Sequence, residues 1–378
     1  MIETPRCSVV IPTFNGLGLL RQCLDSLGES TDLGGVEVVV VDNGSTDGTA
    51  ACVRRHATGA RVVVRPSNEG FARACNRGAD AAAAELLLFL NNDTILRPGW
   101  LEPLLGEMAA HPDVGIVGSR LLYADGTVQH AGVAFSRPLG VPYHFARGAP
   151  PDHPLVCRRR ELKAVTGACL LIRRSLFEDV GGFDTDYVNG FEDVDLCLKV
   201  RRRGQKVVYQ PRSTLTHLEE QTPQRKDHDT PNLERLLGSW PKECTPDETR
   251  VLLEDGFVCR SVQRGTAMHR TIAPLASADE RARWERVAEM ERRIETCDVK
   301  ALYGDPPVVE DWPEDPDALL WGSSVCRGSG LPFLGDAFER RARSVGESSR
   351  PMPALREERG PELVPSDWLE RALRALEA

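Results

Sequence analysis

The chain has 378 residues, of which 41% are hydrophobic and 27% charged, and its formal net charge is −9 at pH 7. This length allows one large domain with its own core and an appended segment. The acidic balance argues against a nucleic-acid partner, because there is no basic excess to displace the counterions of phosphates. Eleven cysteines without a CxxC pair indicate reduced thiols rather than a disulfide framework or a zinc cluster.

The first residues, 1–5, have neither a basic segment nor an apolar core, so no signal peptide is expected. No apolar run reaches the length needed to cross a bilayer. We therefore expect a cytoplasmic protein. Peripheral contact with the inner face of the membrane stays open.

The first half of the chain alternates predicted strands and helices. Continuous apolar runs predict strands over 8–11, 36–41, 61–65 and 85–90, and the segments between them predict helices over 17–27, 47–56 and 69–84. Asn68 is the expected N-cap of the last helix. Strands without polar alternation are typical of a sheet covered on both faces. This order predicts an α/β fold with a doubly wound, mostly parallel sheet.

The next part is more irregular. A helix over 98–111 and a strand over 114–117 precede a proline-rich section, 121–160, in which the turn residues at 124–126 predict a hairpin. A strand over 168–172, helices over 174–180 and 192–203 and a strand over 206–209 follow. We expect one catalytic domain over 1–240. Residues 241–378 are expected to be an extension of helices, at 278–295 and 367–377, and loops, with an open role.

Two predicted strands end in carboxylates, Asp42 and Asp93. In open α/β sheets ligands bind at the carboxyl edge, so we expect both acids at one binding site. The turn 43–49 after Asp42 is rich in glycine and short polar residues. This combination indicates a site that binds a nucleotide and a metal. The alternative role of Asp42 is to cap the following turn.

A second pair of acids, Glu192 and Asp193, begins a predicted helix after an aromatic loop, 183–191. Acids at a helix start and basic residues at its end complement the helix dipole, so these carboxylates could act only in the helix. The aromatic loop favours a sugar site instead, because sugar rings stack on aromatic side chains while their hydroxyl groups need fixed acceptors.

Together these segments resemble the family-two glycosyltransferases. The motifs that carry the resemblance are SVVIPTFN at 8–15, VDNGSTDGT at 41–49, NEGFARACNRG at 68–78, LNND at 90–93, TGACLLIRR at 166–174, GFD at 182–184, EDVDLC at 192–197 and TH at 216–217. They cover residues 7–240. The resemblance is closest to bacterial rhamnosyl- and galactofuranosyl-transferases of cell-wall and surface polysaccharides.

The resemblance implies a GT-A fold and a transferase that uses a nucleotide-diphosphate sugar as donor. Asp42 would then accept a hydrogen bond from the base of the donor, and Asn15 stands where many relatives carry Glu. The residues expected to bind the nucleotide are Pro12, Thr13, Asn15, Asp42, Asn68, Asn76 and Asn92.

A metal site is implied by Asn91 and Asp93, which stand at the family's Asp-x-Asp motif, and by His217. A divalent cation would offset the charge of the leaving diphosphate, and these ligands suit Mn²⁺ or Mg²⁺. A lone histidine is more often structural, which is the alternative for His217.

Asp193 resembles the catalytic base of inverting relatives, which removes the proton of an acceptor hydroxyl. Glu192 is the nearest substitute for that role and would otherwise orient the acceptor or the loop. The acceptor is expected to be a glycan or a lipid-linked molecule, and the oligomeric state is open. A nucleotidyltransferase that makes sugar nucleotides is the alternative, although segment 11–18 lacks the basic residue that its triphosphate needs. An inactive binding protein with the same fold is a further alternative. A dinucleotide oxidoreductase is excluded because no GxGxxG follows the first strand.

Overall fold

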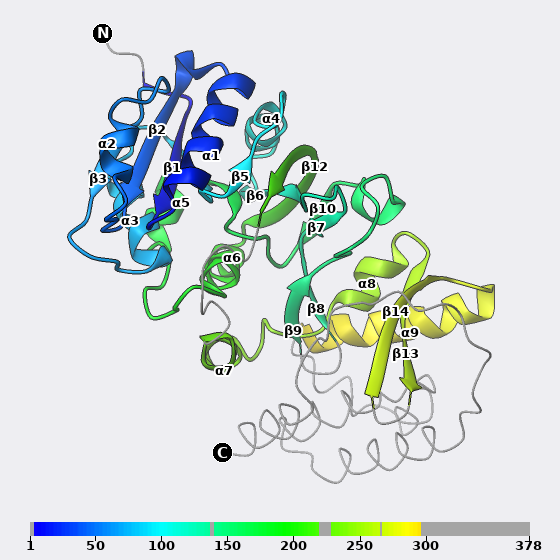
Figure 1. Cartoon of the computed structure of the whole chain (residues 1–378). Helices are drawn as coiled ribbons and strands as arrows, with labels where there is room; N and C mark the ends of the chain where they lie inside the picture. The colour runs from blue at the N-terminus through cyan, green and yellow to red at the C-terminus, as the bar shows by residue number, and fades with distance from the viewer. Residues whose placement is uncertain (1–3, 137–139, 219–227, 265–266, 296–378) are drawn as a thin grey trace. The chain divides into compact units, whose positions relative to one another are not determined.

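The computed structural model of the protein describes residues 4–136, 140–218, 228–264 and 267–295 (Figure 1). The chain divides into two compact units. The first contains residues 1–133 and 144–236, and the second contains residues 134–143 and 237–378.

One mixed sheet organises the first unit, with the strand order β10-β12-β6-β11-β4-β1-β2-β3 (Figure 1). Strand β5 pairs with β12, and β7 pairs with β6. Strands β1, β2, β3 and β4 run parallel, as do β6 and β12. The predicted α/β class with a mostly parallel sheet is confirmed. The strands are β1 Cys7–Thr13, β2 Val36–Asp42, β3 Arg61–Val64, β4 Leu86–Leu90, β5 Thr94–Ile95, β6 Val114–Leu122, β7 Val128–His130, β10 Arg160–Leu162, β11 Cys169–Arg173 and β12 Lys206–His217.

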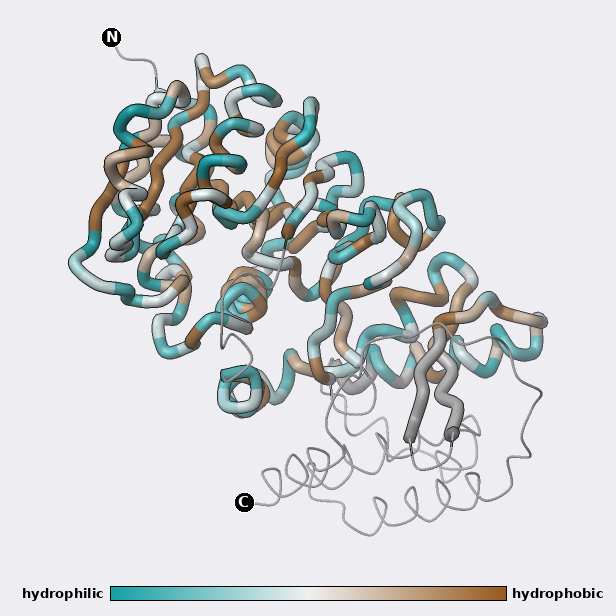
Figure 2. The backbone as a smooth tube through the Cα atoms, viewed as in Figure 1, coloured by the Kyte–Doolittle hydropathy of each residue, from teal (hydrophilic) through white to brown (hydrophobic). Residues whose placement is uncertain are grey.

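Helices cover this sheet because its strands are apolar on both faces. A single hydrophobic cluster joins side chains of β1, β2 and β4 to α1 and α4, and Figure 2 shows the apolar residues along these strands. Helix α3 packs so closely on β1 that a Cβ atom on Gly78 would lie 2.2 Å from Cγ1 of Val10. The helices are α1 Leu17–Ser30, α2 Thr49–Val53, α3 Phe71–Ala81, α4 Glu102–Ala110, α5 Arg174–Asp179, α6 Glu192–Arg202 and α7 Asp229–Ser239, with short 3₁₀ turns at Leu33–Gly35 and Pro154–Val156.

The start of α3 differs from the prediction. The helix begins at Phe71, after Gly70 with φ +87°, and it has no side-chain cap. Oδ1 of Asn68 accepts hydrogen bonds from Nδ2 of Asn43 at 2.8 Å and from the backbone N–H of Gly70 at 3.0 Å. The prediction that Asn68 caps the helix is therefore wrong, because a glycine turn separates this side chain from the first helical residue.

Strand β12 is longer than predicted because it contains a bulge. Its register against β6 shifts between Gln210 and Thr214, so three residues of β12, starting with Pro211, have no counterpart on β6. A proline cannot donate to a strand ladder and is tolerated at such a bulge. The predicted hairpin is confirmed, since β6 and β7 are antiparallel and Gly126 turns between them with φ +89°.

The second unit contains β8 Val133–Ser136, β9 Val141–His144, α8 Glu248–Leu253, β13 Phe257–Arg264, β14 Ala267–Pro274 and α9 Ala278–Glu295. Strands β13 and β14 form an antiparallel pair that the sequence pattern does not predict. The predicted helix at 278–295 is confirmed, with Ser277 Oγ accepting from the N–H of Glu280 at 3.1 Å. The helix predicted at 367–377 lies outside the described residues. Within the described part of the chain, the helices are too short or too polar to cross a membrane.

Candidate active site

The carboxyl ends of the parallel strands bring the predicted nucleotide residues together. Thr13 and Asp42 are register partners at the ends of β1 and β2, and Pro12 is buried in β1 beside Val41. Nδ2 of Asn92, just after β4, donates a hydrogen bond to Oγ1 of Thr13 at 2.8 Å. Residues from three strands therefore line one edge of the sheet, as the sequence predicts.

The loop after β2 is held by hydrogen bonds from two sides. Oδ1 of the buried Asp42 accepts from the N–H of Ser45 at 2.9 Å, so the capping contact of Asp42 is present. Oδ1 of Asn15 accepts from the N–H of Thr46 at 2.8 Å, and the N–H of Asn15 donates to Oγ of Ser45 at 3.0 Å. These contacts join the loops after β1 and β2 into one rigid rim. The contact of Asp42 with a nucleotide base stays a prediction.

Asn76 does not join this rim. Its Nδ2 donates to the carbonyl of Phe183 at 2.9 Å, and its Oδ1 accepts from the N–H of the same residue at 3.0 Å. It lines a separate small pocket with Leu87, near the amino end of β4. Its amide therefore ties α3 to the Gly182–Phe183 turn.

The predicted metal ligands lie together between β4, β5 and β12. Nε2 of His217 is 3.1 Å from Oδ1 of Asp93 and 3.2 Å from Nδ2 of Asn91. The side chains of His217 and Asp93 are only 5% and 13% exposed. The main chain of β5 sets this arrangement, because Thr94 pairs with His217 and the N–H of Leu218 donates to the carbonyl of Asp93 at 3.0 Å.

Gln129 orients His217, and the sequence reading missed it. Oε1 of this fully buried residue accepts from Nδ1 of His217 at 2.6 Å, and its Nε2 donates to the carbonyl of His217 at 3.3 Å. The second contact sets the direction of the amide, so Nδ1 carries the proton. In the neutral ring Nε2 is then a lone-pair donor that faces Asp93. No local pattern in the sequence marks this glutamine.

The residues present fit a divalent cation. Nδ2 of Asn91 lies 3.2 Å from Nε2 of His217, and Oδ1 of the same amide is buried and has no hydrogen-bond partner among the residues that the structure describes. The side chain beside the imidazole thus carries one uncompensated oxygen. Two oxygen ligands and one nitrogen ligand suit Mn²⁺ or Mg²⁺ better than a thiolate-binding metal. Across the described residues, no group of three or more His, Cys, Asp or Glu side chains could hold a metal ion, and this site contains two such residues, Asp93 and His217.

The second pair of acids points in two directions. Oδ2 of Asp193 accepts from the N–H of Gly167 at 2.8 Å, and its Oδ1 accepts from the N–H of Val194 at 2.8 Å. Oε2 of Glu192 accepts instead from the N–H of Gly190 at 2.6 Å. Glu192 is buried, whereas Asp193 is half-buried. Of the two acids, Asp193 is therefore the more accessible from solvent.

The loop before α6 is strained and is held by α7. Asn189 and Phe191 have φ values of +53° and +68°, which non-glycine residues seldom adopt. Asn232 of α7 accepts from the N–H of Val188 and donates to its carbonyl at 2.9 Å. Such strain at the residue just before the paired acids is typical of functional sites. The contact with Asn232 could not be read from the sequence.

Arg235 of α7 holds the same loop through its charge. Its Nη2 atom lies 3.0 Å from Oδ2 of Asp184 and 2.8 Å from Oδ2 of Asp186, and its guanidinium lies over the ring of Tyr187. Burial raises the pKa of Asp184, but a backbone hydrogen bond and Arg235 outweigh it and lower that pKa. The aromatic loop is thus fixed before any ligand arrives.

Strand β7 supports both halves of the site. Gln129 holds the imidazole of His217, while Nε2 of its neighbour His130 accepts from the N–H of Thr166 at 3.3 Å. Burial, followed by the nearby rings of His144 and His217, lowers the pKa of His130 well below its ordinary value, so this ring is neutral. Successive residues of a strand point to opposite sides, which lets one short strand position His217 and the segment beside Asp193.

Comparison with known proteins identifies this domain. Residues 8–181 match the family model for glycosyl transferase family 2. Residues 8–181 are therefore similar to glycosyl transferase family 2, as the motifs predict, and the GT-A fold expected for them agrees with the strand order. Asp193 and His217 follow the matched segment, so their roles depend on geometry rather than on the family match.

Two curated relatives are informative. The O-antigen biosynthesis protein RfbC of Myxococcus xanthus is 35% identical over 57% of this chain and 17% of its own length. The N-acetylglucosaminyl-diphospho-decaprenol L-rhamnosyltransferase of Mycobacterium tuberculosis is 29% identical over 55% of this chain and 75% of its own length. The chain spans at most 42% of the length of the first curated relatives that it matches.

Among solved structures, the mannosyltransferase PcManGT of Pyrobaculum calidifontis, in complex with GDP-Man and Mn²⁺, is 19% identical. The match covers 90% of this chain and 88% of that one, with a TM-score of 0.44.

Proposed function

We propose that the protein transfers a sugar from a nucleotide-diphosphate sugar to an acceptor hydroxyl, with inversion and with the help of Mn²⁺ or Mg²⁺. One observation carries this proposal. The backbone connects the proposed cation site, formed by Asp93, His217 and Asn91, to the separate carboxylate of Asp193. The N–H of Asn91 donates to the carbonyl of Ala168 at 3.0 Å, and the N–H of the preceding residue, Gly167, donates to Asp193.

The donor would lie along the rim formed by the loops after β1, β2 and β4. Thr13 and Asn92 are already joined there, and Asp42 would accept a hydrogen bond from the base with its remaining acceptor capacity. When bound, the cation held by Asp93 and His217 would offset the negative charge that develops on the leaving diphosphate. The buried Oδ1 of Asn91 would complete the protein's share of the ligands.

Asp193 would remove the proton from the attacking hydroxyl. Each of its oxygens accepts one backbone hydrogen bond, which fixes the carboxylate and leaves a lone pair for the acceptor. Attack opposite the diphosphate inverts the anomeric carbon, and a single base is sufficient for that displacement. Glu192, turned toward Gly190, would keep the loop before α6 in place rather than transfer a proton.

The acceptor class is also a proposal. One relative is named for transfer of rhamnose onto a diphospho-decaprenol lipid, and another for O-antigen biosynthesis. By analogy, we propose a glycan or lipid-linked acceptor, polysaccharide biosynthesis as the pathway class and the cytoplasmic face of a membrane as the place of action. Residues 1–240 would contain the catalytic machinery.

Release of nucleoside diphosphate from a panel of nucleotide sugars tests this proposal. The panel is offered with Mn²⁺ and a mixture of glycan and lipid-linked acceptors, and then with a chelator. Asp93→Ala should abolish release, while Asp80→Ala, at an exposed position of α3, should not. Equal release in chelator, or from Asp93→Ala, would contradict the metal role. Release of pyrophosphate from a nucleoside triphosphate and a sugar phosphate would favour the nucleotidyltransferase alternative.

A further inference from the structure

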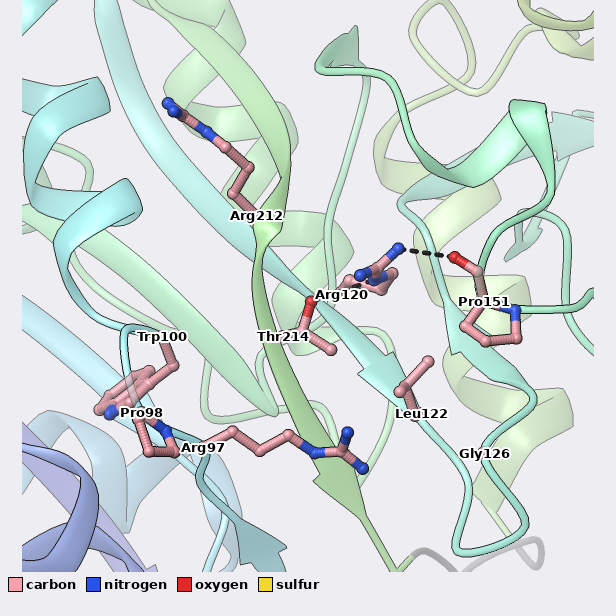
Figure 3. A pocket seen from close by; sticks show the side chains of 9 residues that line it. All are labelled: Arg97, Pro98, Trp100, Arg120, Leu122, Gly126, Pro151, Arg212 and Thr214. Atoms are coloured by element: carbon pink, nitrogen blue, oxygen red, sulfur yellow. Dashed lines mark hydrogen bonds between the residues drawn. The ribbon is translucent and has the colours of Figure 1, made fainter.

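A pocket of about 370 Å³ lies on the first unit outside the active site described above. Three arginines line it, Arg97 from the segment after β5, Arg120 from β6 and Arg212 from the bulge of β12 (Figure 3). Leu122 and Pro151 add apolar walls. This concentration of positive charge is unusual in a chain with a net charge of −9.

The pocket opens on the face of β12 that does not carry the metal ligand. Arg120 and Leu122 of β6 pair with Thr214 and Thr216 of β12. Alternate residues of a strand share a face, so these side chains lie on one side while His217 points to the other. The pocket is therefore separate from the proposed donor site.

Within the described part of the chain, the three arginines form no ion pair. The contacts recorded there for their guanidinium groups are those with Thr216, Thr214 and the carbonyl of Pro151. Elsewhere arginines are commonly paired, as in the contact of Arg159 with Glu107 at 2.7 Å. Among the described residues, the positive charge of the pocket is therefore uncompensated.

Two of these side chains are oriented in advance. Nη2 of Arg97 donates to Oγ1 of Thr216 at 3.1 Å. Nε of Arg120 donates to Oγ1 of Thr214 at 3.1 Å, and its Nη1 donates to the carbonyl of Pro151 at 2.8 Å (Figure 3). These neutral acceptors fix the planar groups without neutralising them, and further N–H donors stay available.

Arg212 supplies a third, adjustable charge. It is exposed, it sits in the bulge of β12, and in Figure 3 it extends away from Arg120, so it would turn inward to meet a ligand. The bulge is the reason that an arginine reaches this position, since the three inserted residues have no counterpart on β6.

We propose that this pocket binds the phosphate group of a mono- or diphosphate ligand. A guanidinium group donates paired N–H hydrogen bonds to two oxygens of a phosphate, which is tetrahedral and carries more than one negative charge. A carboxylate offers fewer oxygens and a single charge, so three unpaired arginines favour phosphate. The phosphate would belong either to a free small molecule or to a phospholipid headgroup.

The test measures binding to the full-length protein in the presence of a chelator, which suppresses anion binding at the proposed metal site. Inorganic pyrophosphate is titrated by calorimetry. In parallel, sedimentation follows binding to phosphatidylglycerol vesicles and to phosphatidylcholine vesicles. The double variant R97Q/R212Q changes two exposed arginines, so it should fold, and thermal melting checks this. The matched control is R54Q/R55Q, two exposed arginines at the end of α2.

We expect R97Q/R212Q to bind about tenfold more weakly than the wild type, while R54Q/R55Q binds normally. Loss of pyrophosphate binding in this pattern supports a free phosphate ligand. Loss of binding only to the anionic vesicles supports a lipid headgroup. The proposal is overturned if the wild type binds neither probe, or if both double variants bind them equally. Because the chelator removes metal-dependent binding, either result is independent of the proposed transferase activity.

Discussion

Gln129 offers the sharpest test of how the metal site is built. The change Gln129→Leu keeps a similar volume but removes the oxygen that accepts from Nδ1 of His217 at 2.6 Å. That N–H is then buried without an acceptor, which costs roughly 1–3 kcal/mol. A residue that accepts a hydrogen bond from a metal-ligating histidine typically contributes 10–100-fold to metal affinity, or about 1.4–2.8 kcal/mol. The first cost lowers the stability of the fold, and the second lowers the affinity for the metal.

The assay is a Mn²⁺ titration in the presence of the nucleoside diphosphate, read by the electron paramagnetic resonance of free Mn²⁺. Gln129→Leu should weaken Mn²⁺ binding by about 10–100-fold, and Gln129→Glu, which keeps an acceptor, should bind much more tightly than the leucine variant. Gln210→Leu is the matched control, because Gln210 is also buried but contacts Glu107. A folded Gln129→Leu protein with wild-type Mn²⁺ affinity would refute the reasoning about the tautomer of His217.

Three further outcomes are expected. Asp42→Ala should raise the KM for the donor with a smaller change in kcat, because the carboxylate of Asp42 would contact a part of the donor that does not react, and steady-state kinetics would show it. Gly167→Ala would place a Cβ atom 3.2 Å from Cβ of Asp193. We therefore expect kcat to fall by about tenfold, while calorimetry finds nucleotide binding unchanged. An unchanged kcat would mean that the position of Asp193 is not critical. Burial works against ionisation of Asp184, but a backbone N–H and Arg235 hold its pKa below the ordinary 3.8. The contact between Asp184 and Arg235 therefore stabilises the fold fully above that pH, and this stabilisation is lost as the pH falls through the lowered pKa. The loss of stability on Arg235→Gln, measured by denaturant unfolding, should therefore shrink in acid, and an equal loss at every pH would contradict this.

The strand ends were predictable because their signals are local. Continuous apolar runs that stop at Asp42 and at the Asn91–Asp93 segment define both the strand and its carboxyl edge. Topology then brings these residues together without any further information from the sequence.

Other features depend on contacts that no local pattern contains. Gln129 and His217 are 88 positions apart, and their contact depends on the bulge that carries β12 on past its predicted end. Arg235 reaches Asp184 across 51 positions. The cap assigned to Asn68 failed for a local reason, because Gly70 breaks the chain direction before the helix. The pair β13 and β14 was missed because apolar and polar residues do not alternate regularly along its segments, as they do in a half-buried strand.

The central claim is that Asp193 removes the acceptor proton while the metal and the nucleotide are bound elsewhere. The most direct measurement is the turnover of Asp193→Asn at saturating donor, with Mn²⁺ and nucleoside diphosphate affinity measured on the same preparation. Asparagine keeps the size of the side chain and can still accept from Gly167, so the fold and both affinities should be retained. Turnover should fall by roughly 10²–10⁴-fold. Near-normal turnover would contradict the account and leave Asp193 as a residue that only stabilises the start of α6.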